Sequence, residues 1–364
     1  MSEASEKTAI VLGIESSCDE TAAAVVRLGP DGGAAILSDV VLSQVAEHAA
    51  FGGVVPELAA RAHLRWLPDV LRRAMREAAG DWTELDAVAV TAGPGLIGGL
   101  ITGMMTAKAI ALASRCAFIA VNHLEAHALS PMLTEGIAPP YLLLLVSGGH
   151  TQLISVDDIG RYRRYGTTID DALGEAFDKV AKMLGLGYPG GPAVEKLAAN
   201  GDAARFAFPR PMKGRAECHF SFSGLKTAVR TAALALDDPT QRDKADICAS
   251  FQQAVAESLA DRVSRAIDMF LDDHPDLAER RLVVAGGVAA NRALRGHLQQ
   301  VAAQHGFTLH APPPAMCTDN AAMVAHAGAL KLARGETDPL NTPARARWPL
   351  DPAAEPAIFA GVKG

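Results

Sequence analysis

The first part of the chain alternates short apolar runs with one long amphipathic stretch. Runs of Val, Ile, Leu and Ala separated by turn residues predict strands over residues 8–14, 22–28 and 35–42. Residues 56–79 then carry apolar positions at a helical spacing and begin with a proline, which suits a first helical turn. The pattern continues with a strand at 85–90, a helix at 98–114 and a short strand at 117–121.

The same order of elements returns in the second part of the chain. Strands are predicted at residues 141–146, 151–156 and 161–167, and the later elements are a helix at 241–271, a strand at 281–285 and helices at 291–305 and 320–333. Two units of three-stranded meander, helix, strand and helix indicate a duplicated α/β fold. We expect two lobes with a central cleft.

The predicted domain boundaries follow from this duplication. The N-terminal lobe spans residues 1–136, and a connector containing Gly and Pro lies at 135–140. The C-terminal lobe spans 137–335 and includes an insert rich in basic and aromatic residues near 200–230. Residues 336–364 carry several prolines and are expected to run extended over the surface.

Composition and charge narrow the class of protein. Of the 364 residues, 49% are hydrophobic and 21% charged, as in an ordinary globular enzyme. The apolar runs are too short to predict a membrane span, and the polar N-terminus does not resemble a signal peptide, so a cytoplasmic protein without a membrane segment is expected. The five cysteines form no CxxC pair, and the net charge of −7 argues against a general nucleic-acid coat protein.

His123 and His127 form the sharpest local signal. Four residues apart on a helix, both imidazoles lie on one face and can reach one metal ion, although a chance pair is the alternative. The metalloprotease motif HExxH places its Glu directly after the first His. Here Glu125 follows two positions after His123, about 200° around a helix with 3.6 residues per turn, which disfavours a protease.

Asp319 is the candidate third ligand. It follows a run of prolines and precedes an Ala-rich helix, so taken alone it is better explained as a helix-capping carboxylate. Two His and one Asp with open coordination positions suit Fe(II), and Zn²⁺ is also chemically allowed.

Glycine-rich turns offer backbone amides to a phosphate-bearing ligand. The segments 13–21 and 146–151 occupy equivalent positions in the two halves, whereas each alone is explained by a tight hairpin turn. The segment 285–291 closes a strand and opens a helix, and Asn291 there either contacts a nucleoside or simply caps the helix.

Two other segments carry weaker signals. The residues 93–98 fit GxGxxG, but no Asp or Glu lies between Asp86 and Glu125 to hold a ribose, so close packing of helix on strand is predicted instead of dinucleotide binding. Residues 205–230 interleave phenylalanines with Arg and Lys. This pattern suits RNA binding by stacking and phosphate contact, or equally a loop that buries its phenylalanines.

Taken together, these motifs resemble those of the TsaD family, the bacterial tRNA N6-adenosine threonylcarbamoyltransferases related to the catalytic subunit of the KEOPS complex. The motifs that carry the resemblance are GIESSCDET at 13–21, NHLEAH at 122–127, LVSGGHTQL at 145–153, GEAFDK at 174–179, YPGGP at 188–192, FSFSGLK at 220–226, GGVAAN at 286–291 and CTDN at 317–320. They occur in family order over nearly the whole chain.

The resemblance implies a fold, a reaction and a site. The fold is the ASKHA fold of actin, heat-shock ATPases and sugar kinases. The reaction is transfer of a threonylcarbamoyl group from threonylcarbamoyl-AMP to N6 of adenosine 37 in tRNAs that read codons beginning with A. One metal ion, usually Fe(II), is implied at His123, His127 and Asp319. The implied substrate contacts are Leu145, Val146, Ser147, Gly148, Gly149, Asp178, Gly191, Glu195 and Asn291, and no general base is assigned.

The resemblance also implies partners, namely a TsaB-like pseudo-enzyme subunit and a TsaE-like ATPase, beside an enzyme that makes the activated intermediate. Two alternative activities remain open: a metal-dependent endopeptidase and a small-molecule kinase of the ASKHA type. A kinase of this fold would carry carboxylates for Mg²⁺ in its phosphate loops and would lack the paired histidines.

Overall fold

The computed structural model of the chain describes residues 8–355, without the side chains of Pro314 and Ala315. Within this range the chain forms two compact units. Unit 1 comprises residues 8–138 and 318–350, and unit 2 comprises residues 139–317 and 351–355.

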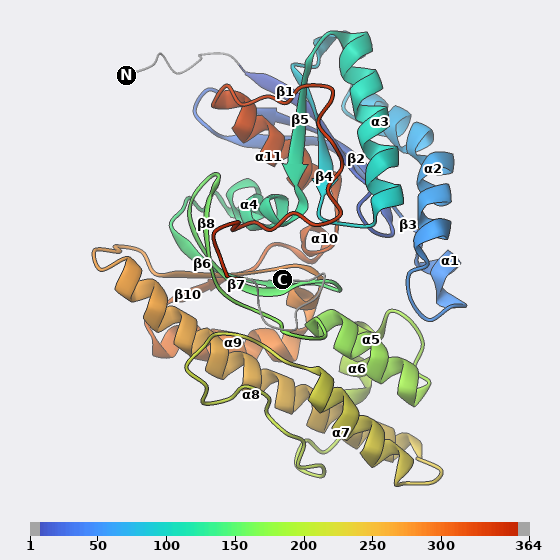
Figure 1. The fold of residues 1–364 in the computed structure, drawn as a ribbon, viewed down its shortest axis with the longest axis vertical. Helices are drawn as coiled ribbons and strands as arrows, with labels where there is room; N and C mark the ends of the chain where they lie inside the picture. Colours follow the sequence, from blue (N-terminus) through green and yellow to red (C-terminus); the bar gives the residue numbers. More distant parts are fainter. Residues whose placement is uncertain (1–7, 356–364) are drawn as a thin grey trace. The chain divides into compact units, whose positions relative to one another are not determined.

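Unit 1 is built on a five-stranded mixed sheet in the order β3-β2-β1-β4-β5 (Figure 1). Its strands are β1 (Ala9–Glu15), β2 (Glu20–Leu28), β3 (Ala34–Ser43), β4 (Ala87–Gly93) and β5 (Ala117–Asn122). The first three form an antiparallel meander, and β4 and β5 run parallel to β1. Its helices are α1 (Val45–Ala49), α2 (Pro56–Glu77), the 3-10 helix η1 (Trp82–Glu84), α3 (Ile97–Ser114), α4 (His123–Glu135) and α11 (Ala321–Ala333).

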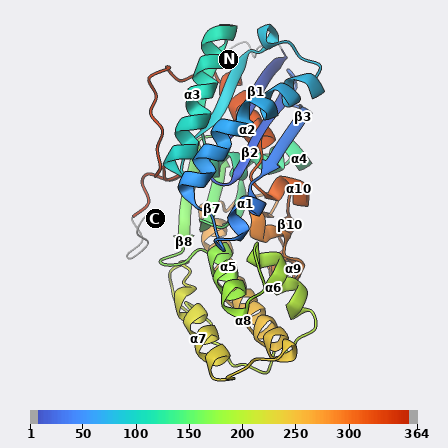
Figure 2. The ribbon, with the colours of Figure 1, turned by 90° about the vertical axis from the view of Figure 1, so that its right-hand side faces the viewer.

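Helices cover the sheet of unit 1, and this explains its continuous apolar strands. Every residue of β4 is buried, as expected for a strand that is covered on both faces. In Figure 2, α2 runs along the sheet next to β2 and β3, while α11 packs against β1 and β4. A side chain at Gly13 would collide with the backbone of Ala321 and Ala325, so the glycine lets α11 approach β1 closely.

Unit 2 repeats this strand order, with the sheet β10-β9-β6-β7-β8. Its strands are β6 (Tyr141–Val146), β7 (Thr151–Asp158), β8 (Arg161–Thr167), β9 (Arg281–Ala285) and β10 (Thr308–His310). Again three strands form an antiparallel meander, and the two later strands run parallel to the first of them. The duplication predicted from the sequence is therefore confirmed.

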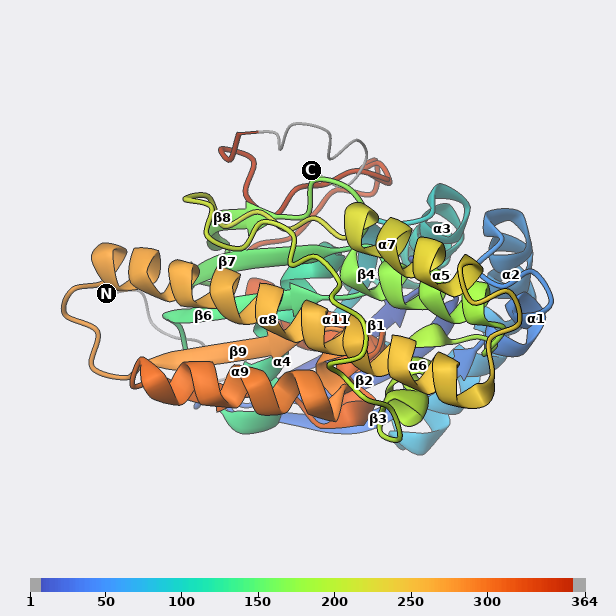
Figure 3. The same ribbon diagram turned by 90° about the horizontal axis from the view of Figure 1, so that it is seen from below.

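The helices of unit 2 enclose a large apolar core. They are α5 (Leu173–Leu184), α6 (Gly190–Ala198), α7 (Ser223–Leu234), α8 (Gln241–Asp273), the 3-10 helix η2 (Gly287–Ala290), α9 (Arg292–Gln304) and α10 (Pro314–Cys317). Figure 3 shows the long helix α8 beside α9, and these two helices are in contact. The core between helices and sheet includes Phe177, Phe251 and Phe270, which are almost fully buried.

The observed division of the chain differs from the predicted domains at its C-terminal side. Residues 318–335 were expected in the C-terminal lobe, but α11 within them packs on β1, β2 and β4 and belongs to unit 1. Residues 336–350, expected as a surface tail, also belong to unit 1. The amide of Arg345 donates to the carbonyl of Ala92, and the amide of Asp338 donates to that of Phe118. The apolar pattern predicts a helix here but does not encode which sheet the helix joins.

The helix α3 is long and apolar enough to cross a membrane by length and composition alone. Its mean hydropathy is 1.4, and 39% of the window is buried within the structure. Leu100, Met104, Ala107 and Ala111 form its buried face, and the helix packs against β4 and α2. The same test is passed by helices that cover a sheet, as α3 does.

Candidate metal centre

The helix α4 presents the two histidines as the spacing predicts. It begins directly after β5 at His123, and the side chain of Asn122 caps it by accepting a hydrogen bond from the amide of Leu124 at 2.9 Å. The rings of His123 and His127 lie with their centroids 4.7 Å apart, at an interplanar angle of 88°. Both side chains are buried.

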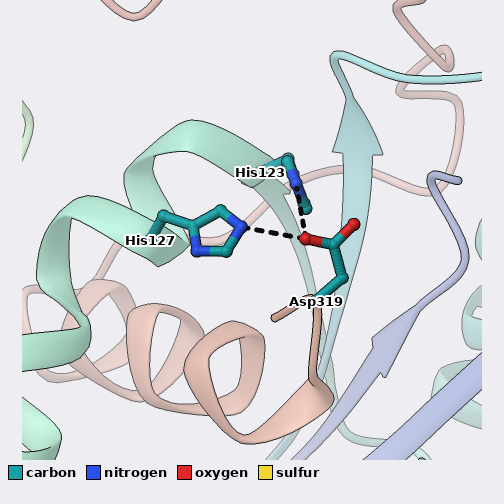
Figure 4. Close-up of side chains that lie close together, drawn as sticks. All are labelled: His123, His127 and Asp319. Carbon is teal, nitrogen blue, oxygen red and sulfur yellow. Dashed lines mark hydrogen bonds and ion pairs between the residues drawn. The ribbon is translucent and has the colours of Figure 1, made fainter. Parts of the chain in front are cut away.

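Asp319 reaches these histidines from the segment that precedes α11 (Figure 4). Its Oδ1 lies 3.0 Å from Nε2 of His127 and 3.5 Å from Nε2 of His123. Candidate ligand atoms of the three residues all lie within 4.8 Å of one another. The helix cap itself is Asn320, whose side chain accepts from the amide of Met323. The capping explanation for Asp319 is therefore not needed.

The electrostatics of the cluster favour bound positive charge. Burial would raise the pKa of Asp319, but His123 and His127 outweigh it and hold that pKa well below its usual range. Burial alone would lower the pKa of His123, yet the carboxylates of Asp319 and Glu15 raise it well above the ordinary value. The two imidazoles and one carboxylate of the cluster are a donor set that fits Fe(II) or Zn²⁺.

Glu15 is a member of the site that the sequence analysis did not single out. It is fully buried at the end of β1, and its Oε2 lies 3.0 Å from Nδ1 of His123. The sequence does contain a signal for it, since a carboxylate that ends an otherwise apolar strand has to find a partner inside the protein. Glu125, in contrast, does not belong to the ligand cluster formed by the described residues.

The glycines of the segment 93–98 serve packing, as predicted. A side chain at Gly95 would meet Ser17, and one at Gly93 would meet the backbone of Arg345. The amide of Leu96 donates to the carbonyl of Ser17 at 2.7 Å. The turn between β4 and α3 thus fixes the 13–21 loop that carries Glu15.

The predicted substrate contacts all lie in unit 2, separate from the metal ligands in unit 1. Leu145 and Val146 are buried at the end of β6. Ser147 accepts a hydrogen bond from the amide of His150 at 3.1 Å, while Gly148 and Gly149 are exposed with open space where a side chain would be. This loop therefore leaves its backbone accessible.

Two of the remaining predicted contacts are carboxylates that hold the start of another helix of unit 2. Asp178 in α5 accepts from the amide of Gly190 at 2.7 Å. Glu195 in α6 accepts from the amide of Arg292, which opens α9, also at 2.7 Å. Gly191 has open space around its α-carbon. These carboxylates fix the starts of α6 and α9.

Asn291 caps α9, which was the alternative to nucleoside contact. Its Oδ1 accepts from the amide of Leu294 at 3.0 Å, and its Nδ2 donates to Gln252 Oε1 at 3.0 Å. The side chain is only 7% exposed. Each end of the amide thus has a partner within the protein, and capacity is left for one further hydrogen bond at each.

The segment 205–230 buries three of its four phenylalanines, and Phe206 is half-buried. Phe208, Phe220 and Phe222 are buried in the core of unit 2, so they are not available for stacking on bases. The basic residues are largely paired with acids: Arg205 with Asp243 and Asp246, Arg210 and Lys213 with Glu257, and Lys226 with Asp171. The interpretation as a buried loop is the one that the structure supports.

Comparison with known proteins identifies the family. The sequence profile described as TsaD, tRNA N6-adenosine threonylcarbamoyltransferase, matches residues 35–326. A curated protein of that name from Brucella canis is 60% identical over 354 residues, covering 97% of this chain and 99% of the relative. A protein of the same name from Brucella anthropi is 59% identical over the same shares of both chains.

Solved structures resemble the chain in fold. The structure of T. kodakarensis HypF has a TM-score of 0.58 at 15% identity and covers 90% of this chain and 48% of its own. A full-length HypF in the phosphate- and nucleotide-bound form has a TM-score of 0.56 at 13% identity, covering 90% of this chain and 46% of its own. With the repeated strand order, these matches confirm the ASKHA fold. The full-length relatives and the profile match show that this chain belongs to the TsaD family of tRNA N6-adenosine threonylcarbamoyltransferases.

Proposed function

We propose that the chain transfers a threonylcarbamoyl group from threonylcarbamoyl-AMP to N6 of adenosine 37 in tRNAs that read codons beginning with A. Membership of the TsaD family supports the reaction class and the tRNA substrate. The observation that carries the proposal within this chain is the convergence of His123, His127 and Asp319 from two distant segments.

The proposed cofactor is one Fe(II) ion per subunit, with Zn²⁺ as the alternative. His123 and His127 would offer their Nε2 atoms, and Asp319 a carboxylate oxygen. Bound there, such an ion would act as a Lewis acid towards substrate oxygens. His123 and His127 hold their donor atoms on one face of α4, whose first turn is capped by Asn122.

The loop at Ser147, Gly148 and Gly149 is the proposed site for the activated intermediate, together with Leu145 and Val146. Its exposed glycines allow a phosphate or carbamoyl oxygen to approach the backbone amides closely. Asp178, Gly191, Glu195 and Asn291 are proposed to contact the same ligand. Their positions support this: Gly191 and Asn291 lie at the starts of α6 and α9. Asp178 and Glu195 accept hydrogen bonds from the amides at those two starts.

The proposed chemistry is direct acyl transfer. The N6 atom of adenosine attacks the carbamoyl carbon, a C–N bond forms, the C–O bond to the phosphate breaks, and AMP leaves while N6 loses a proton. Because the mixed anhydride is already activated, the protein mainly orients the two substrates and stabilises charge on the departing phosphate. No residue is assigned as the general base.

A TsaB-like subunit and a TsaE-like ATPase are the proposed protein partners, and the cytoplasm is the proposed location. An apolar surface on unit 1 supports a protein partner. Side chains of α2 and α3 that are exposed there are Leu58, Leu64, Ile97, Ile101, Met105 and Leu112, with exposed fractions of 37% to 68%. Because α2 and α3 are in contact, we group these exposed residues as one candidate docking surface, defined here as the α2/α3 face.

Reconstitution tests the proposed function. The chain is combined with its partner subunits, an enzyme that makes threonylcarbamoyl-AMP, and tRNA, and the nucleosides are analysed by mass spectrometry. We expect threonylcarbamoyladenosine with the wild type and at least about a 100-fold loss of rate with His123→Ala, as for removal of a metal ligand. Full activity of this variant without bound metal would contradict the proposed metal role. Release of peptides or phosphoryl transfer to a small molecule would instead favour the endopeptidase or kinase alternative.

A further inference from the structure

Both oxygens of the Glu15 carboxylate have hydrogen-bonding partners inside the protein. Its Oε1 accepts from the amide of Ser17 at 2.6 Å. Its Oε2 accepts from the hydroxyl of Thr91 at 2.5 Å and lies 3.0 Å from Nδ1 of His123. Glu15 and Thr91 are both 0% exposed, so the protein rather than solvent determines which protons face this carboxylate.

This arrangement decides which nitrogen of His123 keeps its proton. An ionised carboxylate only accepts hydrogen bonds, so Nδ1 of His123 has to carry a proton when it faces Glu15. A neutral ring with its proton on Nδ1 has its lone pair on Nε2, and Nε2 is the atom that faces Asp319 in the ligand cluster. Glu15 therefore prepares His123 for metal binding.

His127 has no such support among the described residues. Its Nε2 faces Asp319, but its Nδ1 is buried without a hydrogen-bond partner there. The two candidate ligands therefore differ, and control of the tautomer by a carboxylate concerns His123 alone. A ligating histidine whose other nitrogen donates to a carboxylate is a recurrent device that makes the imidazole a stronger ligand.

We propose that Glu15, held by Thr91 and the Ser17 amide, is a positioning residue that fixes the tautomer and orientation of His123 and thereby raises the metal affinity of the site. The inference rests on the metal site of the proposed function. It adds β1 and β4 to the elements that build the centre, since Glu15 ends β1 and Thr91 lies in β4.

The variant Glu15→Gln isolates this role because it keeps the size of the side chain and replaces one acceptor by a donor. If the new amide group faces His123, it donates to Nδ1 and leaves the ring proton on Nε2, where it blocks metal binding. If the amide is turned the other way, its NH₂ group faces the Ser17 amide and the loop loses a hydrogen bond. The first orientation takes the lone pair from Nε2, and the second loosens the side chain that holds His123, so both should weaken metal binding.

Cobalt(II) is the probe, because its visible absorption reports the number and type of its ligands. The metal-free full-length chain is titrated with Co²⁺ by absorption and calorimetry. We expect Glu15→Gln to weaken Co²⁺ binding about 10- to 100-fold and to alter the absorption band, as for loss of an outer partner of a ligating histidine. Thr91→Val removes one donor to the carboxylate and should weaken binding less, by several-fold.

Asp86→Asn is the matched control. Asp86 accepts from the amide of Ile10 at 2.9 Å, near the start of β1 rather than its end, so its loss perturbs the same strand without touching His123. This variant should bind Co²⁺ like the wild type. Thr91→Val keeps the test decisive if Glu15→Gln fails to fold.

The outcomes separate this inference from the proposed function. The role of Glu15 would be overturned if Glu15→Gln bound Co²⁺ with the affinity and absorption of the wild type. If Glu15→Gln does not fold, the same result with Thr91→Val would overturn it. Absence of Co²⁺ binding by the wild type would overturn the inference together with the metal site. Failure of the wild type to modify tRNA, with Co²⁺ binding still dependent on Glu15, would overturn only the proposed reaction and would support the inference.

Discussion

Unit 1 buries several ionisable side chains, and their partners differ in kind. Glu15, His123 and Asp319 form one coupled cluster in which each charge has an opposite charge beside it. His326 in α11 is only 2% exposed, and its Nδ1 has no hydrogen-bond partner among the described residues. Burial lowers its pKa to about 4. The cluster of Glu15, His123 and Asp319 consists of charged groups that stabilise one another. His326, in contrast, is kept neutral by its apolar surroundings.

Replacement of His326 by Leu should remove an acid sensitivity of the fold. The folded pKa of about 4 lies below the ordinary value of 6.5, so the neutral ring contributes stability that is complete above pH 6.5. That contribution is lost as pH falls from 6.5 towards 4, because only the unfolded chain takes up the proton there. From pH 7 to pH 4.5 we expect the wild type to lose about 2–3 kcal/mol more unfolding free energy than His326→Leu.

Urea unfolding of both proteins across this pH range, with a chelator present, measures the difference. A gap between the two curves that stays constant with pH would show that His326 does not titrate in this way. Since His326 lies outside the ligand cluster, both proteins should bind metal alike at neutral pH.

Single residues of the centre were predictable to different degrees. The spacing of His123 and His127 on a helix needs only local geometry, so the sequence predicts that pair directly. Asp319 lies 192 residues beyond His127. Its sequence context left it between metal ligand and helix cap, and the resemblance to the family favoured the ligand. Glu15 escaped notice because its role depends on β1 ending beside α4, which no local pattern encodes.

At the scale of elements, α4 depends on its first turn, which carries His123. Asn122 caps this turn through its Oδ1, and its Nδ2 donates to the carbonyl of Trp348 at 3.0 Å. The C-terminal segment 336–350 therefore stabilises the start of the ligand-bearing helix. This contact explains why a segment without regular structure belongs to unit 1.

We expect Asn122→Ala to weaken both the fold and metal binding. Loss of the cap should lower the unfolding free energy by about 1–2 kcal/mol, and fraying of the first turn should weaken Co²⁺ binding several-fold. Thr240→Ala is the matched control, since Thr240 caps α8 in unit 2 by accepting from the amide of Asp243. It should cost about 1 kcal/mol of stability and leave Co²⁺ affinity unchanged. Equal Co²⁺ affinity in the two variants would argue against coupling between the cap and the site.

The helices and strands were easier to predict than the elements against which they pack. The strand β6 and the long helix α8 begin at the predicted residues, because strong apolar periodicity sets them locally. The membership of α11 in unit 1 was not predictable, since it depends on glycines at β1 and in α11 that allow close packing. For the segment 205–230, the sequence alone left two interpretations open. A mixture of phenylalanines with Arg and Lys is expected both for an RNA-binding surface and for a loop that buries its phenylalanines.

At the scale of the whole molecule, the same strand order occurs in both units, but the two units carry different chemistry. Unit 1 holds the candidate metal ligands and unit 2 holds the glycine loop. Unit 1 also carries the exposed α2/α3 face, on which Ile97, Ile101 and Met105 recur every four residues along α3. This spacing places them on one stripe of the helix, beside the stripe of buried residues that cover the sheet.

Introduction of a charge into this stripe should separate partner binding from metal binding. In Ile101→Glu the new carboxylate replaces a side chain that is 50% exposed, so the fold tolerates it, but a partner that covers the face would bury an unpaired charge. Since such burial costs several kcal/mol, affinity for the proposed TsaB-like subunit should fall by about two orders of magnitude. The matched control is Leu234→Glu in α7, where an equally apolar side chain is 69% exposed on unit 2. Both variants are tested by calorimetry, once with the partner and once with Co²⁺. If the affinity for the partner falls equally in both variants, the partner does not dock specifically on α3.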